Sequence, residues 1–286
     1  MKLAIVTDST CDLSAQTLAD LGVVRVPLYV HFKGNTYKDW EEITPKELIA
    51  GVQSGAAILG MPRTSQPSPQ DFKDAFSQAV AGGADRILCI TISAELSGTY
   101  GSAILAQKEA GVPVDVFDSR AASLGVGMMV RRAAEMRDAK RSIGDITSEL
   151  KRIRDNHMVR FTVAGLDFLQ RGGRIGKAQA LLGGLLNIKP LLAVKDGRIE
   201  PAGKARGAKK ALKEIVGAVQ AFAATHPGTL LVHFLHVQDP EAANTLRGEL
   251  GAAGVDFIDA GSYEIGAVIA SHVGPGTYGV YLYPLP

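Results

Sequence analysis

The first half of the chain alternates short apolar segments with helix-like segments, and this alternation constrains the fold more than any other feature. Leu3–Thr7 and Arg86–Ile92 are short apolar runs that end in polar loops, as buried strands do. Ser68-Pro69-Gln70-Asp71 is a helix start signal with proline at the first helical position, and Gly82-Gly83 ends that helix. Strands that alternate with helices predict an α/β domain whose mainly parallel sheet has helices on both faces.

Turn signals predict hairpins at two places. Val23–Phe32 meets a turn at Lys33-Gly34-Asn35, which indicates a hairpin within the first half. Lys195-Asp196-Gly197-Arg198 separates two strand-like runs in the second half. The second half therefore reads as an α+β domain with a mixed or antiparallel sheet. We place the boundary near Asn156, which gives domains 1–156 and 157–286.

Composition excludes several classes of function. The 286 residues carry 31 basic and 29 acidic side chains, and a net charge of +2 is too balanced for bulk binding to nucleic acid or anionic membrane. Two cysteines, Cys11 and Cys89, make neither a disulfide framework nor a metal set. The N-terminus has no signal-peptide pattern, and no apolar run approaches the length of an integral membrane segment. We expect a cytoplasmic protein without a metal or cofactor.

Three loops after predicted strands are rich in small hydroxyl side chains. They are Asp8-Ser9-Thr10, Thr64-Ser65-Gln66, and the segment from Ser93 to Thr99, in which Ser97-Gly98 precedes a helix. Loops that follow the strands of a parallel sheet line its binding crevice. A helix N-terminus with a serine at its cap offers N–H groups and a hydroxyl to an anion. From the residues alone, capping and turn chemistry already account for Thr64 and Ser97.

A basic glycine-rich turn lies in the middle of the chain. Arg171, Arg174 and Lys177 fall within one short turn, followed by a predicted small-residue helix over Ala178–Leu186. Such a cluster forms an anion-binding or acidic-partner surface, or else a solvated charge run, and spacing leaves both open. The turn does not have the spacing of a P-loop.

Catalytic motifs are scarce. The chain has no HExxH, GxSxG or paired-cysteine motif. Apart from His272, which precedes Gly274-Pro275-Gly276, no residue is a candidate general base for Ser97. A serine hydrolase acting on acyl esters therefore stays open as an alternative, with no catalytic residue assigned.

Four motifs together resemble one family. The run GGRIGKAQALLGGLLNIKPLL, from Gly172 to Leu192, resembles the central signature of the DegV family, which includes the FakB fatty-acid-binding proteins. The other three are Asp8-Ser9-Thr10, the pair Thr64–Ser68 and Leu96–Thr99, and His272–Gly276. Their order and spacing match over nearly the whole chain. One departure is Gly176, where many relatives carry serine.

The resemblance implies a lipid-binding protein rather than an enzyme. It implies that Thr64 and Ser97, with Ser65, Gly98 and His272, hold the carboxylate of a long-chain fatty acid such as palmitate. The acyl chain would lie in a buried tunnel, for which Leu181–Ile188 and Ile265–Ile269 could supply apolar wall.

The resemblance also implies a protein partner. Relatives present the acid to an ATP-dependent fatty-acid kinase subunit, which makes the acyl-phosphate. Arg171, Arg174 and Arg206 are the candidates to face that partner or the phosphorylated head group.

Overall fold

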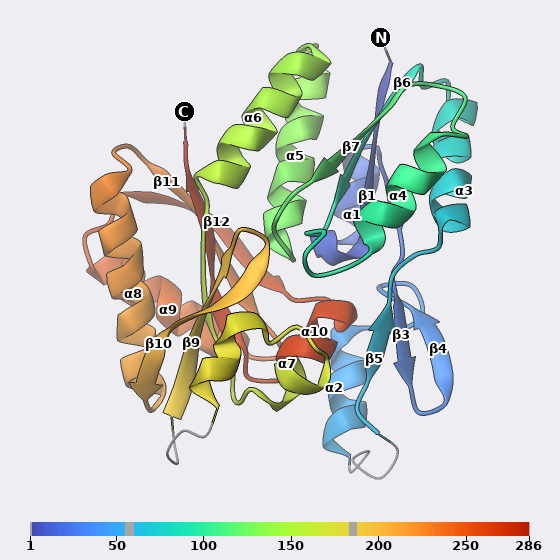
Figure 1. The fold of residues 1–286 in the computed structure, drawn as a ribbon. Helices are drawn as coiled ribbons and strands as arrows, with labels where there is room; N and C mark the ends of the chain where they lie inside the picture. The colour runs from blue at the N-terminus through green and yellow to red at the C-terminus, as the bar shows by residue number, and fades with distance from the viewer. Residues whose placement is uncertain (1, 55–59, 183–187, 286) are drawn as a thin grey trace. The chain divides into compact units, whose positions relative to one another are not determined.

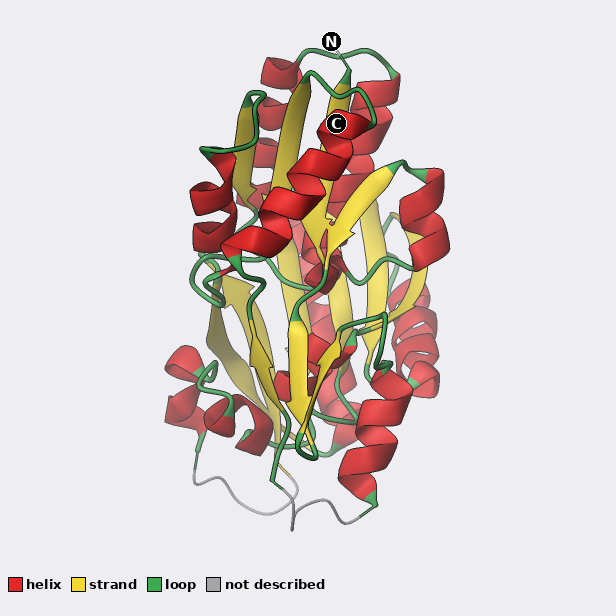
Figure 2. Ribbon diagram, turned by 90° about the vertical axis from the view of Figure 1, so that its right-hand side faces the viewer, coloured by secondary structure: helices red, strands yellow, loops and turns green. Residues whose placement is uncertain are grey.

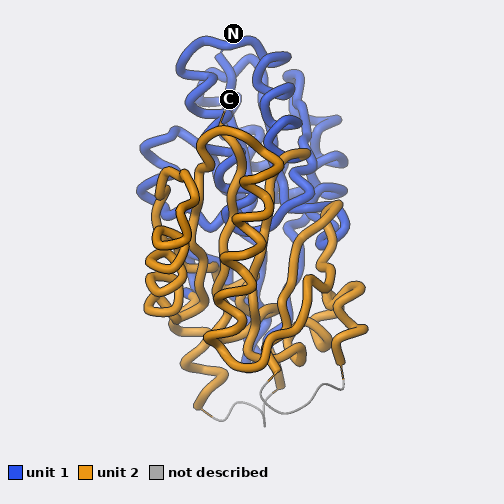
Figure 3. Tube along the Cα trace, turned by 90° about the vertical axis from the view of Figure 1, so that its left-hand side faces the viewer, with its two compact units in different colours: residues 1–44, 62–154 blue, residues 45–61, 155–286 orange. Residues whose placement is uncertain are grey.

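The computed structural model describes residues 2–54, 60–182 and 188–285. The chain divides into two compact units (Figure 3): unit 1 comprises residues 1–44 and 62–154, and unit 2 comprises residues 45–61 and 155–286. The change of unit at residue 155 falls next to the boundary expected at Asn156. The segment 45–61 falls within the first domain that we expected but belongs to unit 2. The division into domains 1–156 and 157–286 stays a prediction.

Unit 1 is built around a parallel four-stranded sheet with the order β2-β1-β6-β7, as the sequence predicted. Its elements in chain order, with α6 ending at the unit boundary, are β1 (Leu3–Asp8), η1 (Ser9–Cys11), α1 (Ala15–Asp20), β2 (Val23–Val26), β3 (Tyr29–Phe32), β4 (Asn35–Lys38), β5 (Arg63–Ser65), α3 (Pro69–Ala81), β6 (Arg86–Thr91), α4 (Thr99–Gln107), β7 (Val114–Asp118), α5 (Leu124–Asp138) and α6 (Ile143–Asp155).

Helices cover both faces of this sheet (Figure 1). On one face, Phe72 and Phe76 of α3 pack against Val6 and Cys89, and all four side chains are fully buried. α5 contacts β1 and β6 from the other side. The capping box at Ser68 forms as predicted, since its hydroxyl accepts from Asp71 N–H while the Asp71 carboxylate accepts from Ser68 N–H.

The predicted strand Val23–Phe32 is in fact two strands in two sheets. β2 belongs to the parallel sheet, whereas β3 lies in a three-stranded antiparallel sheet with the order β4-β3-β5. Pro27 stands between them and has no N–H to continue a strand ladder. The predicted hairpin is confirmed between β3 and β4, where Lys33 and Gly34 both have positive φ.

Unit 2 contains a six-stranded mixed sheet with the order β10-β9-β8-β13-β11-β12, in which only β11 and β12 are parallel neighbours. Its elements in chain order are α2 (Pro45–Gln53), β8 (Met158–Thr162), α7 (Asp167–Arg171), η3 (Gly176–Leu181), β9 (Ile188–Lys195), β10 (Arg198–Arg206), α8 (Ala208–Thr225), β11 (Leu230–His236), α9 (Pro240–Ala252), β12 (Phe257–Glu264), α10 (Ala267–Val273) and β13 (Tyr278–Pro284).

The main apolar core of unit 2 lies between α8, α9 and one face of the mixed sheet. Figure 2 shows the strands and their flanking helices by colour. The predicted hairpin at Asp196-Gly197 joins β9 and β10. The expected helix Ala178–Leu186 begins instead as the 3₁₀ helix η3, and residues 183–187 lie outside the described part. No helix among the described residues is long and apolar enough to cross a bilayer.

The carboxylate of Asp8 is fully buried and joins the end of β1 to the end of β6. One oxygen accepts the N–H of Thr10 at 2.9 Å and also its hydroxyl, and the other accepts the N–H of Ile92 at 2.7 Å. Ile92 directly follows β6 and opens the loop that leads to Ser97. The aspartate of the Asp8-Ser9-Thr10 motif therefore has a structural role, because it fixes where that loop starts.

We predict that Asp8→Ala lowers the free energy of unfolding by about 2–4 kcal/mol, because buried N–H groups lose their acceptor. Asp8→Asn keeps the size and one acceptor oxygen, so its loss should be smaller. Urea unfolding followed by circular dichroism measures both. An alanine variant within about 0.5 kcal/mol of the wild type would contradict this role.

Candidate functional site

Thr64 and Ser65 lie on β5, the short edge strand of the small antiparallel sheet. Thr64 pairs with Val30 of β3, and neighbouring side chains on a strand point to opposite faces. The Ser65 hydroxyl lies 2.9 Å from Nε2 of His31, whose Nδ1 lies 2.9 Å from the hydroxyl of Thr36. Ser65 is therefore engaged within the sheet, on the face opposite Thr64.

The β5 segment meets the Ser97-Gly98 loop within unit 1. Gly98 lies so close to Gln66 that a Cβ at this position would be 2.2 Å from the Gln66 Oε1. Gln66 Nε2 also donates to the hydroxyl of Ser102 at 3.3 Å. Two of the hydroxyl-rich loops are thus brought together, and a Cβ at position 98 would displace the Gln66 amide from this contact.

The N-terminus of α4 is open to an anion. Its N-cap residue is Gly98 rather than the expected Ser97, so the N-cap position itself supplies no side chain to the first turn. The half-buried Ser97 shares a 2.8 Å hydrogen bond with the Thr99 hydroxyl and accepts the Thr99 N–H at 3.4 Å. This long bond satisfies one amide of the first turn, and the positive end of the helix favours a carboxylate.

In unit 2, His272 lies in the last turn of α10 and packs directly on the glycine-rich turn. A Cβ at Gly172 would be 2.2 Å from the His272 Nδ1. Gly274 ends α10 with a φ of +77°, and a Cβ there would meet the ring of Phe168 at 2.7 Å. The end of α10 and the residues around Gly172 therefore form one closely packed unit, although they are about a hundred residues apart in sequence.

His272 is held in its neutral form. Burial and, to a smaller extent, the positive charge of Arg174 together lower its pKa to about 4. Arg174 is fixed by two bonds to the turn: its Nη1 donates to Gly172 O at 2.8 Å, and its N–H donates to Leu169 O at 3.0 Å. At physiological pH the imidazole can give or accept a hydrogen bond without carrying charge.

The cations of the basic turn have different environments. Arg171 is exposed at the end of α7, whereas Arg174 is half-buried beside His272. Lys177 forms an ion pair with Glu200 at 2.7 Å. Arg206 is exposed at the end of β10. The three cations of this turn therefore do not share one environment, and the roles of Arg171, Arg174 and Arg206 stay predictions.

Gly176 departs from the family pattern, and the structure supplies a local reason. Its φ is +52°, and a Cβ would lie 2.4 Å from the carbonyl oxygen of Ile199. A serine at this position would require β10 or the turn to move. The backbone here is suited to glycine alone.

Sequence reasoning missed three of these arrangements: the Ser65–His31 contact, the packing of His272 on Gly172, and the pairing of Lys177 with Glu200. Each joins elements distant in sequence. The only available signal was the presence of glycines beside the candidate residues, since glycine marks close backbone approach.

The pKa of His272 predicts how stability depends on pH. The folded value of about 4 lies below the ordinary 6.5, so the unfolded chain binds more protons between these values. The free energy of unfolding should fall as the pH drops through this window, by up to about 1.4 kcal/mol per pH unit from this group. Urea unfolding at several pH values should give a shallower dependence for His272→Gln than for the wild type. Parallel curves would refute the assignment.

Comparison with known proteins identifies the family. A family model described as "Uncharacterised protein, DegV family" matches residues 2–285. A DegV domain-containing protein from Deinococcus radiodurans is 47% identical over 100% of this chain and 99% of its own length. A fatty acid-binding protein from Thermotoga maritima is 33% identical over 98% of this chain and 96% of its own length.

Solved structures give the same result. A DegV family protein from Thermus thermophilus, described by its fatty acid binding, superposes with a TM-score of 0.94 at 50% identity, and both chains are covered completely. A stearic acid-binding protein from Eubacterium ventriosum superposes with a TM-score of 0.90 at 29% identity, covering 99% of this chain and 98% of its own. The predicted family and fold class are therefore confirmed: this chain belongs to the DegV family.

Proposed function

We propose that this protein binds a long-chain fatty acid and holds its carboxylate with Thr64, Ser97 and His272. Ser65 and Gly98 complete this set by shaping the loops, since the Ser65 hydroxyl is engaged with His31 and Gly98 permits the contact with Gln66. The strongest support is the similarity, over the whole chain, to relatives described as fatty-acid-binding. The open N-terminus of α4 and the neutral His272 suit a carboxylate ligand.

The free energy of fatty-acid binding can come mainly from burial of the acyl chain, so uncharged hydrogen-bond donors suffice for the carboxylate. Burial of an acyl chain contributes about 0.8 kcal/mol per methylene, so a long chain supplies on the order of 10 kcal/mol before ordering costs. The carboxylate must still be hydrogen-bonded when it is buried. Hydroxyl and neutral imidazole donors satisfy it without a full ion pair, which suits a carrier that later releases its ligand.

The tunnel for the acyl chain is part of the proposal. Ile265 and Val268, in and beside α10, are buried and could supply some of its wall. Most of the other predicted wall segment, Leu181–Ile188, lies outside the described residues.

The proposed role in the cell is presentation of the acid to an ATP-dependent kinase subunit in the cytoplasm, for fatty-acid metabolism. The protein alone would have no turnover and would need no cofactor. Arg171 and Arg206 are exposed and available to a partner, whereas Arg174 lies next to His272.

The hydrolase alternative is less well supported by the geometry. In unit 1 the Ser97 hydroxyl bonds to Thr99. The serine–histidine contact that unit 1 does contain joins Ser65 to His31 and is completed by a hydroxyl, that of Thr36. A hydroxyl cannot stabilise an imidazolium as a carboxylate does in a catalytic triad.

Lipid extraction and mass spectrometry of the purified protein test the proposal directly. We expect an intact fatty acid at one equivalent, whereas burst release from an activated ester would favour the hydrolase. Thr64→Ala and Ser97→Ala should each weaken binding by about 1–3 kcal/mol in calorimetry, because a buried acceptor loses a donor. Thr245→Ala, on the exposed side of α9, is the matched control. Unchanged affinity in both site variants would disprove the assignment.

Substitution of the two arginines of the turn should distinguish fatty-acid binding from presentation of the acid to a kinase subunit. Arg171→Ala should leave fatty-acid affinity unchanged but reduce acyl-phosphate formation when a cognate kinase subunit and ATP are supplied, because an exposed arginine can grip phosphate or carboxylate oxygens. Arg174→Ala should alter both, because its charge acts on His272. Parallel lipid-binding and coupled kinase assays decide this. Loss of lipid binding in Arg171→Ala would place the whole turn in the ligand site.

A further inference from the structure

A groove lies within unit 2 between α8 and the sheet strands β8 to β10. It has a volume of about 480 Å³, within the usual range of small-molecule sites. Its sheet side includes Met158, Phe161 and Leu191, and its helix side includes Ala218 and Phe222. None of the residues proposed above for the fatty-acid carboxylate is among its lining residues. The groove is therefore distinct from the proposed carboxylate site.

One cationic side chain in this mainly apolar set of lining residues has no counter-ion among the described residues. Arg160, the third residue of β8, is half-buried in the groove. Its one hydrogen bond runs from Nη1 to the neighbouring carbonyl oxygen of Val159 at 3.0 Å. Across residues 2–54, 60–182 and 188–285, no carboxylate lies within 4.0 Å of its guanidinium. Most of its N–H donors are thus unused by the protein.

The environment of Arg160 points to an anionic ligand. Burial lowers its pKa, and no nearby negative charge offsets this effect. A partly desolvated cation gains from pairing with an anion, because the reduced local dielectric strengthens the pair. Glu214 of α8 also lines the groove but is exposed and makes no ion pair with Arg160. Its charge disfavours ligands with more than one negative charge.

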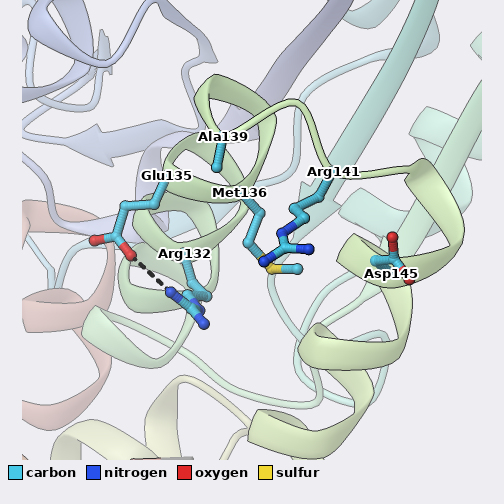
Figure 4. A pocket seen from close by; sticks show the side chains of 6 residues that line it. All are labelled: Arg132, Glu135, Met136, Ala139, Arg141 and Asp145. Carbon is cyan, nitrogen blue, oxygen red and sulfur yellow. Dashed lines mark hydrogen bonds and ion pairs between the residues drawn. The ribbon is translucent and has the colours of Figure 1, made fainter.

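A second cleft, in unit 1, makes a useful contrast (Figure 4). Its Arg132 is paired with Glu135 at 3.2 Å and with Glu149 at 3.1 Å. Its Asp145 accepts the hydroxyl of Ser142 at 2.8 Å, and its second arginine, Arg141, is exposed. The partly buried arginine of this cleft is thus already paired with carboxylates, unlike Arg160.

We propose that the groove beside α8 binds a monoanionic amphiphile, with a carboxylate on Arg160 and a medium-length apolar tail against Met158 and Phe222. The planar guanidinium offers two parallel N–H donors to a carboxylate, and the apolar walls accept the tail. The protein would then hold two amphiphilic anions by different means: one through hydroxyls and a neutral histidine, the other through a full ion pair.

The test uses decanoate as the probe, with the protein first saturated with palmitate and its methionine methyl groups labelled with ¹³C. Decanoate should shift the Met158 methyl resonance saturably in NMR spectra. Arg160→Gln should weaken this binding at least about tenfold, as expected for loss of a partly desolvated ion pair. Decanol should bind more weakly than decanoate, and Arg160→Gln should leave its affinity unchanged.

Two further variants serve as controls: one blocks the groove, and the other changes an arginine elsewhere. Ala218→Leu should block decanoate while leaving Arg160 in place, and Arg132→Gln in the unit 1 cleft should have no effect. Equal decanoate affinity in the wild type and in a folded Arg160→Gln variant would overturn the proposal, as would an unmoved Met158 signal at millimolar decanoate. Mass spectrometry reports palmitate separately. A protein that fails to hold palmitate would disprove the proposed function without deciding the groove.

Discussion

Close backbone approach at glycine is the constraint on which both parts of the candidate site depend. Gly98 lets the Gln66 side chain lie against the start of α4, and Gly172 lets the His272 ring lie on the basic turn. A Cβ at either position would come within 2.2 Å of a side-chain atom of its neighbour, so the observed positions of Gln66 and His272 depend on the absence of a Cβ. Either side chain would have to shift if the glycine were replaced.

A second feature of the candidate site is that positive charges near these contacts are suppressed or paired. The pKa of His272 is lowered by burial and by Arg174, so two groups that could both be cations form one charged and one neutral partner. Lys177 is neutralised by Glu200 in the same region. A head group bound beside His272 would meet a hydrogen-bonding surface with one nearby positive charge, and an exposed Arg171 remains for other contacts.

The sequence predicted elements well where local chemistry decides structure. The capping box at Ser68, the turn at Lys33-Gly34 and the hairpin at Asp196-Gly197 depend only on neighbouring residues. The sequence did not predict elements whose structure depends on distant residues. For example, β5 is a polar three-residue strand that exists because β3 pairs with it. The candidate site was predicted as separate motifs. The environments of the cations could not be predicted without the fold, since Lys177 lies in η3 and its partner Glu200 lies on β10.

Unit 2 is not continuous in sequence, and this has a consequence for how the protein is made. α2, at residues 45–53, belongs to unit 2 and contacts α10, at residues 267–273. On the ribosome α2 therefore emerges among the earliest residues, while the helix that it packs against emerges among the last. The buried Leu48 and Ile49 can reach this contact only near the end of synthesis. Closure of this long loop should therefore be a late folding step, together with insertion of β13 between β8 and β11 of the mixed sheet.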